Sequence, residues 1–327
     1  MTQEPDYRNT VTRPAFAELP APVRAGIESA AGSVVDVAFP SVTTGFTGAY
    51  AGLLALGDGR RVFAKAAGPL APFALEAIPR EARILGQLDG RVTAPALVGA
   101  AAVGDWQLLV LEAIEGRLPG MPWTAADAEA AHGACLELAA LEPTDVAALT
   151  DSSLAADVGA DPMALACLDE LASGARSWPD GIPPLTPDHA RELARLGGLA
   201  GQALAGERLV HCDLRPDNML VTPAGRARVV DWNWVTRGPV WCDWVGLLPL
   251  MAHHGLDVER MAARSPLLEG VDAEAVDAFL AILVGYLVDA CVQPTVPGSR
   301  SAVRAHQRHM ARTFTALVAS RRGWAQV

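Results

Sequence analysis

The chain has 327 residues, of which 51% are hydrophobic and 19% are charged; this is enough apolar sequence for a large core and excludes a disordered chain. The net charge of −11 argues against a nucleic-acid partner, because proteins that bind nucleic acids usually carry a basic face. The start lacks the apolar core of a signal peptide, no apolar stretch is long enough to span a bilayer, and the five cysteines form no CxxC pair, so we expect a reduced, cytoplasmic protein with no membrane partner and no implied protein partner.

The N-terminal third is predicted to form a small, mostly antiparallel sheet with one inserted helix. A short helix is expected over 14–32, before the sheet. Apolar runs rich in Val, Leu or aromatic residues, bounded by Gly and Asp, predict strands at 35–39, 49–56, 61–67, 97–103 and 106–114. The pair Asp58-Gly59 is typical of a two-residue hairpin turn. Apolar residues at helical spacing predict a helix over 76–88, with Pro79 in its first turn.

After Gly116 the pattern changes to segments rich in Ala and Leu. Helices are expected over 124–142, 162–174 and 187–206, followed by a compact β-like segment over 208–240 and further helices over 243–327. The predicted fold class is therefore α+β, with a β-rich N-terminal part, a short connector and a mainly helical C-terminal part.

A polar pattern in the β-like segment predicts phosphoryl-transfer chemistry. The sequence HCDLRPDN at 211–218 is followed by a turn and by Asp231 in VVDW. The oxygens of Asn218 and Asp231 can converge on Mg²⁺, a hard cation that prefers such ligands. Asp213 can face a substrate hydroxyl and accept its proton. An ordinary hairpin with surface acids would not account for His211, two aspartates and a rare asparagine at these offsets.

This segment resembles the catalytic and metal-binding loops of the aminoglycoside phosphotransferase and choline kinase families, small-molecule kinases with the protein-kinase fold. The resemblance implies two lobes: a nucleotide-binding lobe over 1–111, a hinge over 112–116, and a helical lobe over 117–327 with the catalytic loop and acceptor site. It implies ATP, with GTP as an alternative, and Mg²⁺ as cofactors. It also implies that His211 and Asp243 support the catalytic loop.

The composition draws attention to one residue of the expected sheet. Of the 26 Lys and Arg residues, Lys65 is the only lysine, and it lies on the predicted third strand. The resemblance requires a lysine there that orients the α- and β-phosphates and is held by a glutamate of the next helix. We expect Glu81 to be that glutamate; Glu76, at the expected helix start, is the alternative, although an acid there also complements the helix dipole.

The remaining contacts implied by the resemblance are less specific. The loop TTGFTGAYAG at 43–52 would cover the phosphates, with Gly45 allowing close backbone approach and Thr47 donating a hydroxyl, although any hairpin could have such a sequence. The connector would bind adenine through backbone groups near Glu112 and Ile114. Arg215 would steady either the γ-phosphate or a neighbouring carboxylate.

The acceptor is not fixed by these motifs. Tryptophans at 232–244 could stack on a sugar or hold a cation, but aromatic residues beside a hairpin usually pack in the core. Acids at 257–277 could attract a cationic acceptor, and a solvated helix face explains them equally well. Asp231 is not followed by Phe-Gly and no Ala-Pro-Glu follows, which argues against protein substrates.

The sequence therefore predicts an ATP-dependent O-phosphotransferase for a small hydroxyl acceptor, such as an aminoglycoside-like antibiotic or a sugar, and by family analogy a resistance role. The alternatives are a metabolite kinase for an amino alcohol and a non-catalytic protein that binds nucleotide. The complete set of Lys65, Glu81, Asp213, Asn218 and Asp231 disfavours the last alternative.

Overall fold

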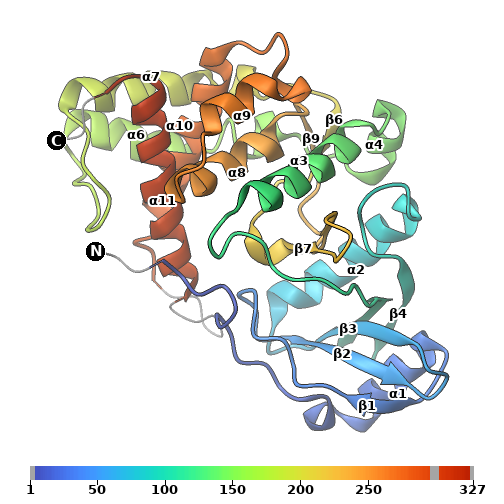
Figure 1. Cartoon of the computed structure of the whole chain (residues 1–327). Helices are drawn as coiled ribbons and strands as arrows, with labels where there is room; N and C mark the ends of the chain where they lie inside the picture. Colours follow the sequence, from blue (N-terminus) through green and yellow to red (C-terminus); the bar gives the residue numbers. More distant parts are fainter. Residues whose placement is uncertain (1–3, 295–301, 325–327) are drawn as a thin grey trace.

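The computed structural model describes residues 4–294 and 302–324. A five-stranded antiparallel sheet forms the blue lobe of Figure 1, and a larger, mainly helical lobe lies above it. The strands, in the spatial order β1-β2-β3-β5-β4, are β1 (Val35–Ala38), β2 (Tyr50–Leu56), β3 (Arg61–Ala67), β4 (Leu97–Val103) and β5 (Trp106–Glu112). The sheet lobe also contains the short 3₁₀ helix η1 (Phe16–Glu18) and the helices α1 (Ala21–Ala31) and α2 (Pro72–Leu88).

The alternation of side chains along β3 places the single lysine on the face of the sheet that packs against α2. Val62, Ala64 and Ala66 are buried in one apolar cluster with α1, on one side of the sheet. Because successive side chains of a strand point to opposite faces, Lys65 points to the other side, where α2 packs. Lys65 is paired in register with Leu109 of β5, so a central strand pair fixes its backbone.

The second lobe is built mainly of helices around one large apolar core. Its helices are α3 (Ala125–Ala139), α4 (Pro143–Leu149), α5 (Leu154–Asp157), α6 (Pro162–Ser173), α7 (Pro187–Ala203), α8 (Cys242–His253), α9 (Val258–Arg264), η3 (Pro266–Leu268), α10 (Ala273–Ala290) and α11 (Ala302–Arg321). The helix α10 is central and packs against α6, α7 and α11. Within the described residues, no helix combines the length and the apolar character needed to cross a bilayer.

Short strands and a 3₁₀ turn carry the polar pattern between α7 and α8. They are β6 (Arg208–Val210), η2 (Pro216–Asn218), β7 (Met219–Val221), β8 (Ala227–Val229) and β9 (Thr236–Gly238). The strand β6 pairs with β9, and β7 pairs with β8 as a hairpin. The strand β7 lies on the side of the helical lobe that faces the sheet (Figure 1), and the Val230 N–H, just after β8, donates to the Asn218 oxygen, just before β7, at 3.0 Å.

The predicted strands of the sheet are confirmed, with small differences at their ends, but two expectations about helices are wrong. The helix expected over 76–88 begins at Pro72, so Pro79 lies inside it instead of in its first turn. A proline is well tolerated at Pro72, where no helical N–H bond is lost, and the buried face of α2 offsets the bond that Pro79 removes. The expected helix over 14–32 is reduced to η1 and α1, because Pro20 separates them.

Close packing of α10 against α6 generates a stability prediction. A Cβ at Gly285 would lie 2.5 Å from the Ala164 carbonyl oxygen and 2.8 Å from Leu168 Cγ. We expect Gly285→Ala to lower the free energy of unfolding by about 1–3 kcal/mol, as overpacking does. Gly198→Ala is the matched control: no atom lies within 4 Å of the added carbon, and alanine favours the helix by up to ~1 kcal/mol. Urea denaturation measures both, and equal stability of the two variants would contradict the observed packing.

Candidate active site

The segment from His211 to Asn218 is held in place by a carboxylate of the following helix. The backbone N–H groups of His211 and Cys212 donate to the two oxygens of Asp243, at 2.7 and 3.0 Å. Cys212 has a φ of 66°, a left-handed conformation that is uncommon for a residue other than glycine, and these two bonds stabilise it. Burial raises the pKa of Asp243 to about 6, although both N–H donors oppose the shift. His211 itself is fully buried with its ring edge-on to Trp232.

The next residues of this loop orient Asp213. The Asn218 side-chain NH₂ donates to the Asp213 backbone oxygen at 2.8 Å and to its carboxylate at 2.9 Å. The Arg215 guanidinium forms an ion pair with Asp213 and donates to Asp217 at 2.8 Å. In this structure Arg215 contacts neighbouring carboxylates, one of the two partners considered for it, and its contact with the γ-phosphate stays a prediction. Burial raises the pKa of Asp213 to about 7 against the effect of Arg215, with Asp231 and Asp217 adding to the rise.

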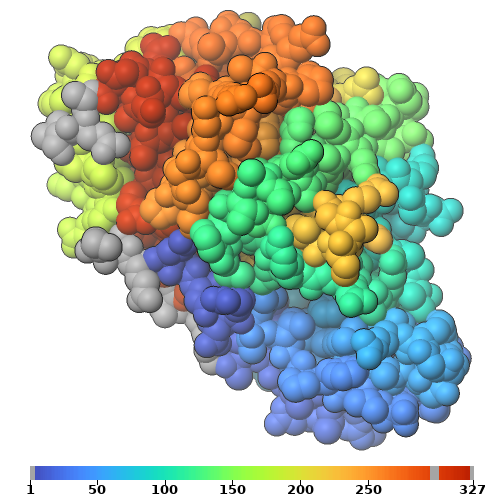
Figure 2. Space-filling model, in the orientation of Figure 1, coloured from blue at the N-terminus to red at the C-terminus, as the bar shows by residue number. Residues whose placement is uncertain are grey.

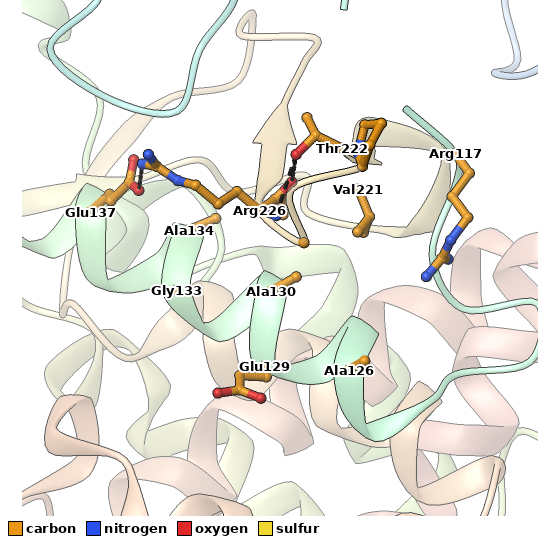
Figure 3. Close-up of a pocket in the computed structure, with 13 residues that line it drawn as sticks. Arg117, Ala126, Glu129, Ala130, Gly133, Ala134, Glu137, Val221, Thr222 and Arg226 are labelled. Atoms are coloured by element: carbon orange, nitrogen blue, oxygen red, sulfur yellow. Dashed lines mark hydrogen bonds and ion pairs between the residues drawn. The ribbon is translucent and has the colours of Figure 1, made fainter. Parts of the chain in front are cut away.

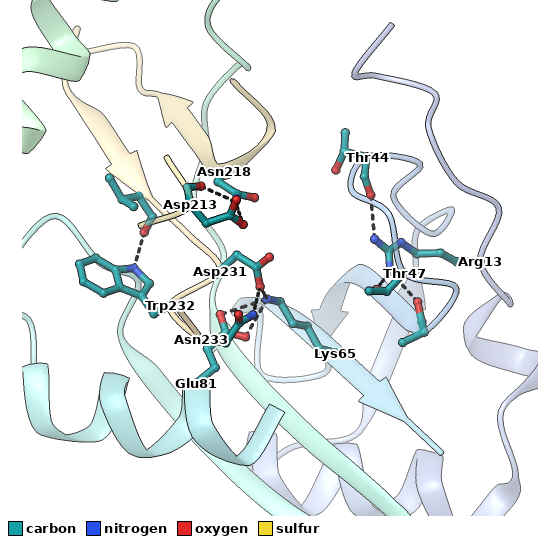
Figure 4. Close-up of polar contacts among 12 residues, drawn as sticks. Arg13, Thr44, Thr47, Lys65, Glu81, Asp213, Asn218, Asp231, Trp232 and Asn233 are labelled. Atoms are coloured by element: carbon teal, nitrogen blue, oxygen red, sulfur yellow. Dashed lines mark hydrogen bonds and ion pairs between the residues drawn. The ribbon is translucent and has the colours of Figure 1, made fainter. Parts of the chain in front are cut away.

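Lys65 joins the two lobes through carboxylates (Figure 4). Its Nζ lies 2.7 Å from a carboxylate oxygen of Glu81 on α2 and 3.0 Å from Asp231, which follows β8. Both oxygens of the buried Glu81 carboxylate accept from Lys65 Nζ, so Glu81 is the glutamate that holds the lysine; Glu76, among the described contacts, has no bond to it. Burial alone would lower the pKa of Lys65, but Asp231 and Glu81 outweigh it and raise the pKa above its ordinary value. The lysine is therefore a fixed cation between the lobes.

The donor set of Asn218 and Asp231 fits a divalent cation. Both N–H bonds of the Asn218 amide go to Asp213, which leaves its Oδ1 facing away from that residue. Asp231 uses one oxygen, Oδ1, for Lys65 and for the Asn233 side chain, and its second oxygen is outside these bonds. Burial would raise the pKa of Asp231, but the charge of Lys65 outweighs this effect and lowers the pKa. The carboxylate is therefore charged. An amide oxygen and a charged carboxylate oxygen are the ligands that Mg²⁺ prefers.

The loop between β1 and β2 faces these residues, and an arginine from the N-terminal segment fills it (Figure 4). Arg13 donates to the backbone oxygens of Thr44 and Ala49, both at 2.7 Å, and to the Thr47 hydroxyl at 3.3 Å. Gly45 has a φ of 81°, which a residue with a Cβ would adopt only with strain. Thr47 thus has a protein partner already, and contact of Gly45 or Thr47 with phosphate stays a prediction.

The tip of this loop reaches the helical lobe. The Phe46 ring lies 5.1 Å from the His306 ring on α11, and the Arg215 guanidinium lies over Phe46 at 5.1 Å from its centroid. An aromatic face attracts such a cation. The loop is therefore in contact with the catalytic segment as well as with Arg13.

The connector offers fewer free groups than the sequence suggested. The Glu112 backbone N–H donates to the Ala96 oxygen at 2.9 Å, and the Glu112 side chain accepts from the Ala96 N–H and pairs with Arg228. The side chain of Glu112 is thus committed to the fold. Binding of adenine by backbone groups at Glu112 and Ile114 stays a prediction.

The residues considered for acceptor binding mostly have structural roles. Of the four tryptophans, Trp232, Trp241 and Trp244 are buried, and Trp234 alone is 46% exposed and stacks on Phe73. Several of the acids are helix caps or members of ion pairs with arginines: Asp257, Asp272, Glu274, Asp277 and Glu259. These acids therefore give no support to a cationic acceptor.

A groove of about 560 Å³ lies elsewhere, between α3 and the β7–β8 hairpin (Figure 3). Its walls include Glu129, Gly133 and Glu137 of α3 and Thr222 and Arg226 of the hairpin. None of the predicted site residues lines it. The predicted site residues instead gather around Lys65 and Asp213, at the junction of the lobes.

Sequence reasoning missed Arg13 and the segment that carries it. Arg13 lies about thirty residues before the loop that it fills, outside any regular element, and it is one of many arginines in the chain. Neither spacing nor composition distinguishes it, so only the folded structure reveals the contact.

Comparison with known proteins agrees with this geometry. The model of the phosphotransferase enzyme family matches residues 54–281, a range that includes Lys65, Asp213 and Asp231 but not Arg13. No curated protein matches the sequence.

Two solved structures are similar over most of their length. The chain shares 17% identity with macrolide 2′-phosphotransferase from Brachybacterium faecium, covering 89% of this chain and 97% of that one, with a TM-score of 0.51. It shares 15% identity with choline kinase from Streptococcus pneumoniae, covering 90% and 98%, with a TM-score of 0.50. At these identities the similarity concerns the fold, and it confirms the predicted two-lobed, protein-kinase-like α+β class.

The bracing of the catalytic segment leads to a prediction about Asp243. Asp243→Ala leaves the amides of His211 and Cys212 without their acceptor, and we expect the free energy of unfolding to fall by about 2 kcal/mol or more. Asp243→Asn retains one acceptor oxygen and costs less.

Asp257→Ala serves as the comparison, because it removes an ordinary helix cap worth ~1 kcal/mol. Chemical denaturation measures the three variants. If Asp243→Ala were no more destabilising than Asp257→Ala, the bracing role would be contradicted.

Proposed function

The chain belongs to the phosphotransferase enzyme family, and we propose that it transfers the γ-phosphate of ATP to a hydroxyl group of a small molecule. One observation carries the proposal: Lys65, held by Glu81, meets Asp231, on the same side of the lobe junction as the bonded pair of Asp213 and Asn218 (Figure 4). These are the groups needed to hold a triphosphate and to position a nucleophile.

Each group then has a distinct task. Lys65 is a fixed point charge that orients the α- and β-phosphates. Asn218 and Asp231 would hold Mg²⁺, which supplies charge neutralisation for the phosphates when bound. Asp213 accepts the proton of the acceptor hydroxyl. At the same time the hydroxyl oxygen bonds to the γ-phosphorus, and the bond from the γ-phosphorus to the bridging β–γ oxygen breaks, releasing ADP. Because the transition state of this transfer is loose, the positioning of Asp213 matters more than its basicity.

The acceptor is proposed to be an aminoglycoside-like antibiotic or a sugar. The space beside Asp213 is bordered by the helical lobe, where Tyr286 of α10 is 45% exposed. Burial raises the pKa of Tyr286, and the negative charges of Asp213 and Asp161 add to that rise. An aromatic hydroxyl beside carboxylates suits a polar, hydroxylated molecule. Macrolide and choline, named for the two similar structures, enlarge the set of acceptors to test.

The experiment is a coupled assay of ADP or GDP release with Mg²⁺. Its panel contains aminoglycosides, macrolides, sugars and amino alcohols. Acceptor-dependent release would establish the kinase and name its substrate class. Nucleotide binding without release for any acceptor would favour the non-catalytic alternative, and absence of nucleotide binding would contradict the proposal.

The role of Asp213 predicts the effect of one substitution. Asp213→Asn keeps the size of the side chain but removes the proton acceptor, so we expect turnover to fall by about 10²-fold or more. Asp105→Asn, in the exposed turn between β4 and β5, should leave turnover unchanged. Near-normal turnover by Asp213→Asn would exclude Asp213 as the base.

The role of Lys65 predicts a second effect. The planar fork of arginine does not match the compact ammonium between Glu81 and Asp231, so Lys65→Arg should raise the KM for ATP and lower kcat by about 10-fold or more. The reverse exchange, Arg61→Lys at the exposed end of the same strand, is the control. Steady-state kinetics with both variants is the test, and unchanged ATP kinetics in Lys65→Arg would remove Lys65 from the site.

A further inference from the structure

Residues 4–14 form an N-terminal segment that lies where the two lobes meet, seen as dark blue atoms in Figure 2. At one end the Glu4 carboxylate lies 3.1 Å from His254 Nε2, and the fully buried Tyr7 places its hydroxyl 2.8 Å from His306 Nδ1 on α11. At the other end the N–H groups of Thr10 and Val11 donate to the Thr43 oxygen. The segment thus connects the helical lobe to the loop between β1 and β2.

Arg13, near the end of this segment, uses most of its donors on the loop. Besides the bonds to Thr44, Thr47 and Ala49, its Nε donates to the Val42 oxygen at 3.1 Å. These contacts span residues 42–49, so one guanidinium fixes the shape of the whole loop. All four acceptors are uncharged oxygens.

The charge of Arg13 is therefore not neutralised by its hydrogen-bond partners. Among the described residues, no ion pair of Arg13 with a carboxylate lies within 4.0 Å. Burial lowers its pKa to about 10, and the more distant Asp231 and Asp217 oppose the shift, so the group is still a cation at neutral pH. Arg13 is half-buried, and such a charge gains when an opposite charge pairs with it. The site that Arg13 faces is the one proposed to receive a triphosphate (Figure 4).

We propose that Arg13 is a positioning residue for the nucleotide: it shapes the loop over 42–49 and contributes a positive charge that the β- and γ-phosphates neutralise. The inference rests on the proposed function, since it concerns the same nucleotide. The N-terminal segment, which lies outside the matched range of residues 54–281, would then contribute to nucleotide binding.

The test is calorimetric titration of Mg·ATP, Mg·ADP and adenosine into the full-length protein and its variants. Arg13→Gln keeps hydrogen-bonding groups but loses the charge. We expect its Kd for Mg·ATP to rise about 10- to 100-fold, the size of one lost charge-assisted interaction, with a smaller rise for Mg·ADP and less than ~2-fold for adenosine. Arg24→Gln is the matched control. Arg24 also donates to backbone oxygens, those of Ala17 and Leu19, but it lies on α1 and not in the loop between β1 and β2.

A purely structural role would give a different pattern. It would leave the affinity for Mg·ATP unchanged, or it would weaken ATP and adenosine to the same extent; either result overturns the inference. Thermal melting without ligand checks that each variant is folded. Arg13→Lys retains the charge and should keep most of the discrimination between ATP and adenosine, and its complete loss in this variant would overturn the charge assignment.

Titration of the unmodified protein distinguishes failure of this inference from failure of the proposed function. Unmodified protein that binds Mg·ATP, with Arg13→Gln unchanged, contradicts the inference alone. Unmodified protein that binds no nucleotide contradicts both.

Discussion

One half-buried cation links the two lobes at the site on which the proposed function depends. Lys65 comes from β3, Glu81 from α2, and Asp231 from the segment after β8, so a single ammonium group fixes the sheet lobe, its helix and the helical lobe relative to one another. Of the three side chains only Glu81 is buried, and without the Lys65 ammonium its carboxylate would be left uncompensated. The same three residues that set the lobe arrangement would therefore also set the geometry of phosphate binding.

In the rest of the site, negatively charged carboxylates are separated by positively charged side chains. Asp213, Asp217 and Asp231 would repel one another without Arg215 and Lys65 between them. The backbone of the catalytic segment adopts its left-handed turn at Cys212 because Asp243 accepts two of its N–H groups. Burial raises the pKa of Asp213 and of Asp243, and Arg215 opposes this rise at Asp213 as the two N–H donors do at Asp243.

The sequence was sufficient to predict those site residues whose positions depend on local spacing. The offsets within HCDLRPDN and the single lysine on the predicted third strand led to the expected site residues, and the structure brings Lys65, Glu81 and Asp231 into contact. It was insufficient where contacts are distant or interchangeable. Pro79 was misplaced because tertiary packing outweighs its local penalty, the partner of Arg215 depends on the loop's folded path, and Arg13 meets its loop only through the packing of Tyr7 and Thr10.

The proposed function requires that the Lys65 cluster bind the phosphates of a nucleotide. A crystal structure of the protein with Mg²⁺ and a non-hydrolysable ATP analogue tests it most directly. We expect α- or β-phosphate oxygens within hydrogen-bond distance of Lys65 Nζ and a metal ion bound by Asn218 Oδ1 and the Asp231 carboxylate. A nucleotide bound elsewhere, for instance in the groove beside α3, with the Lys65 cluster unchanged, would contradict it.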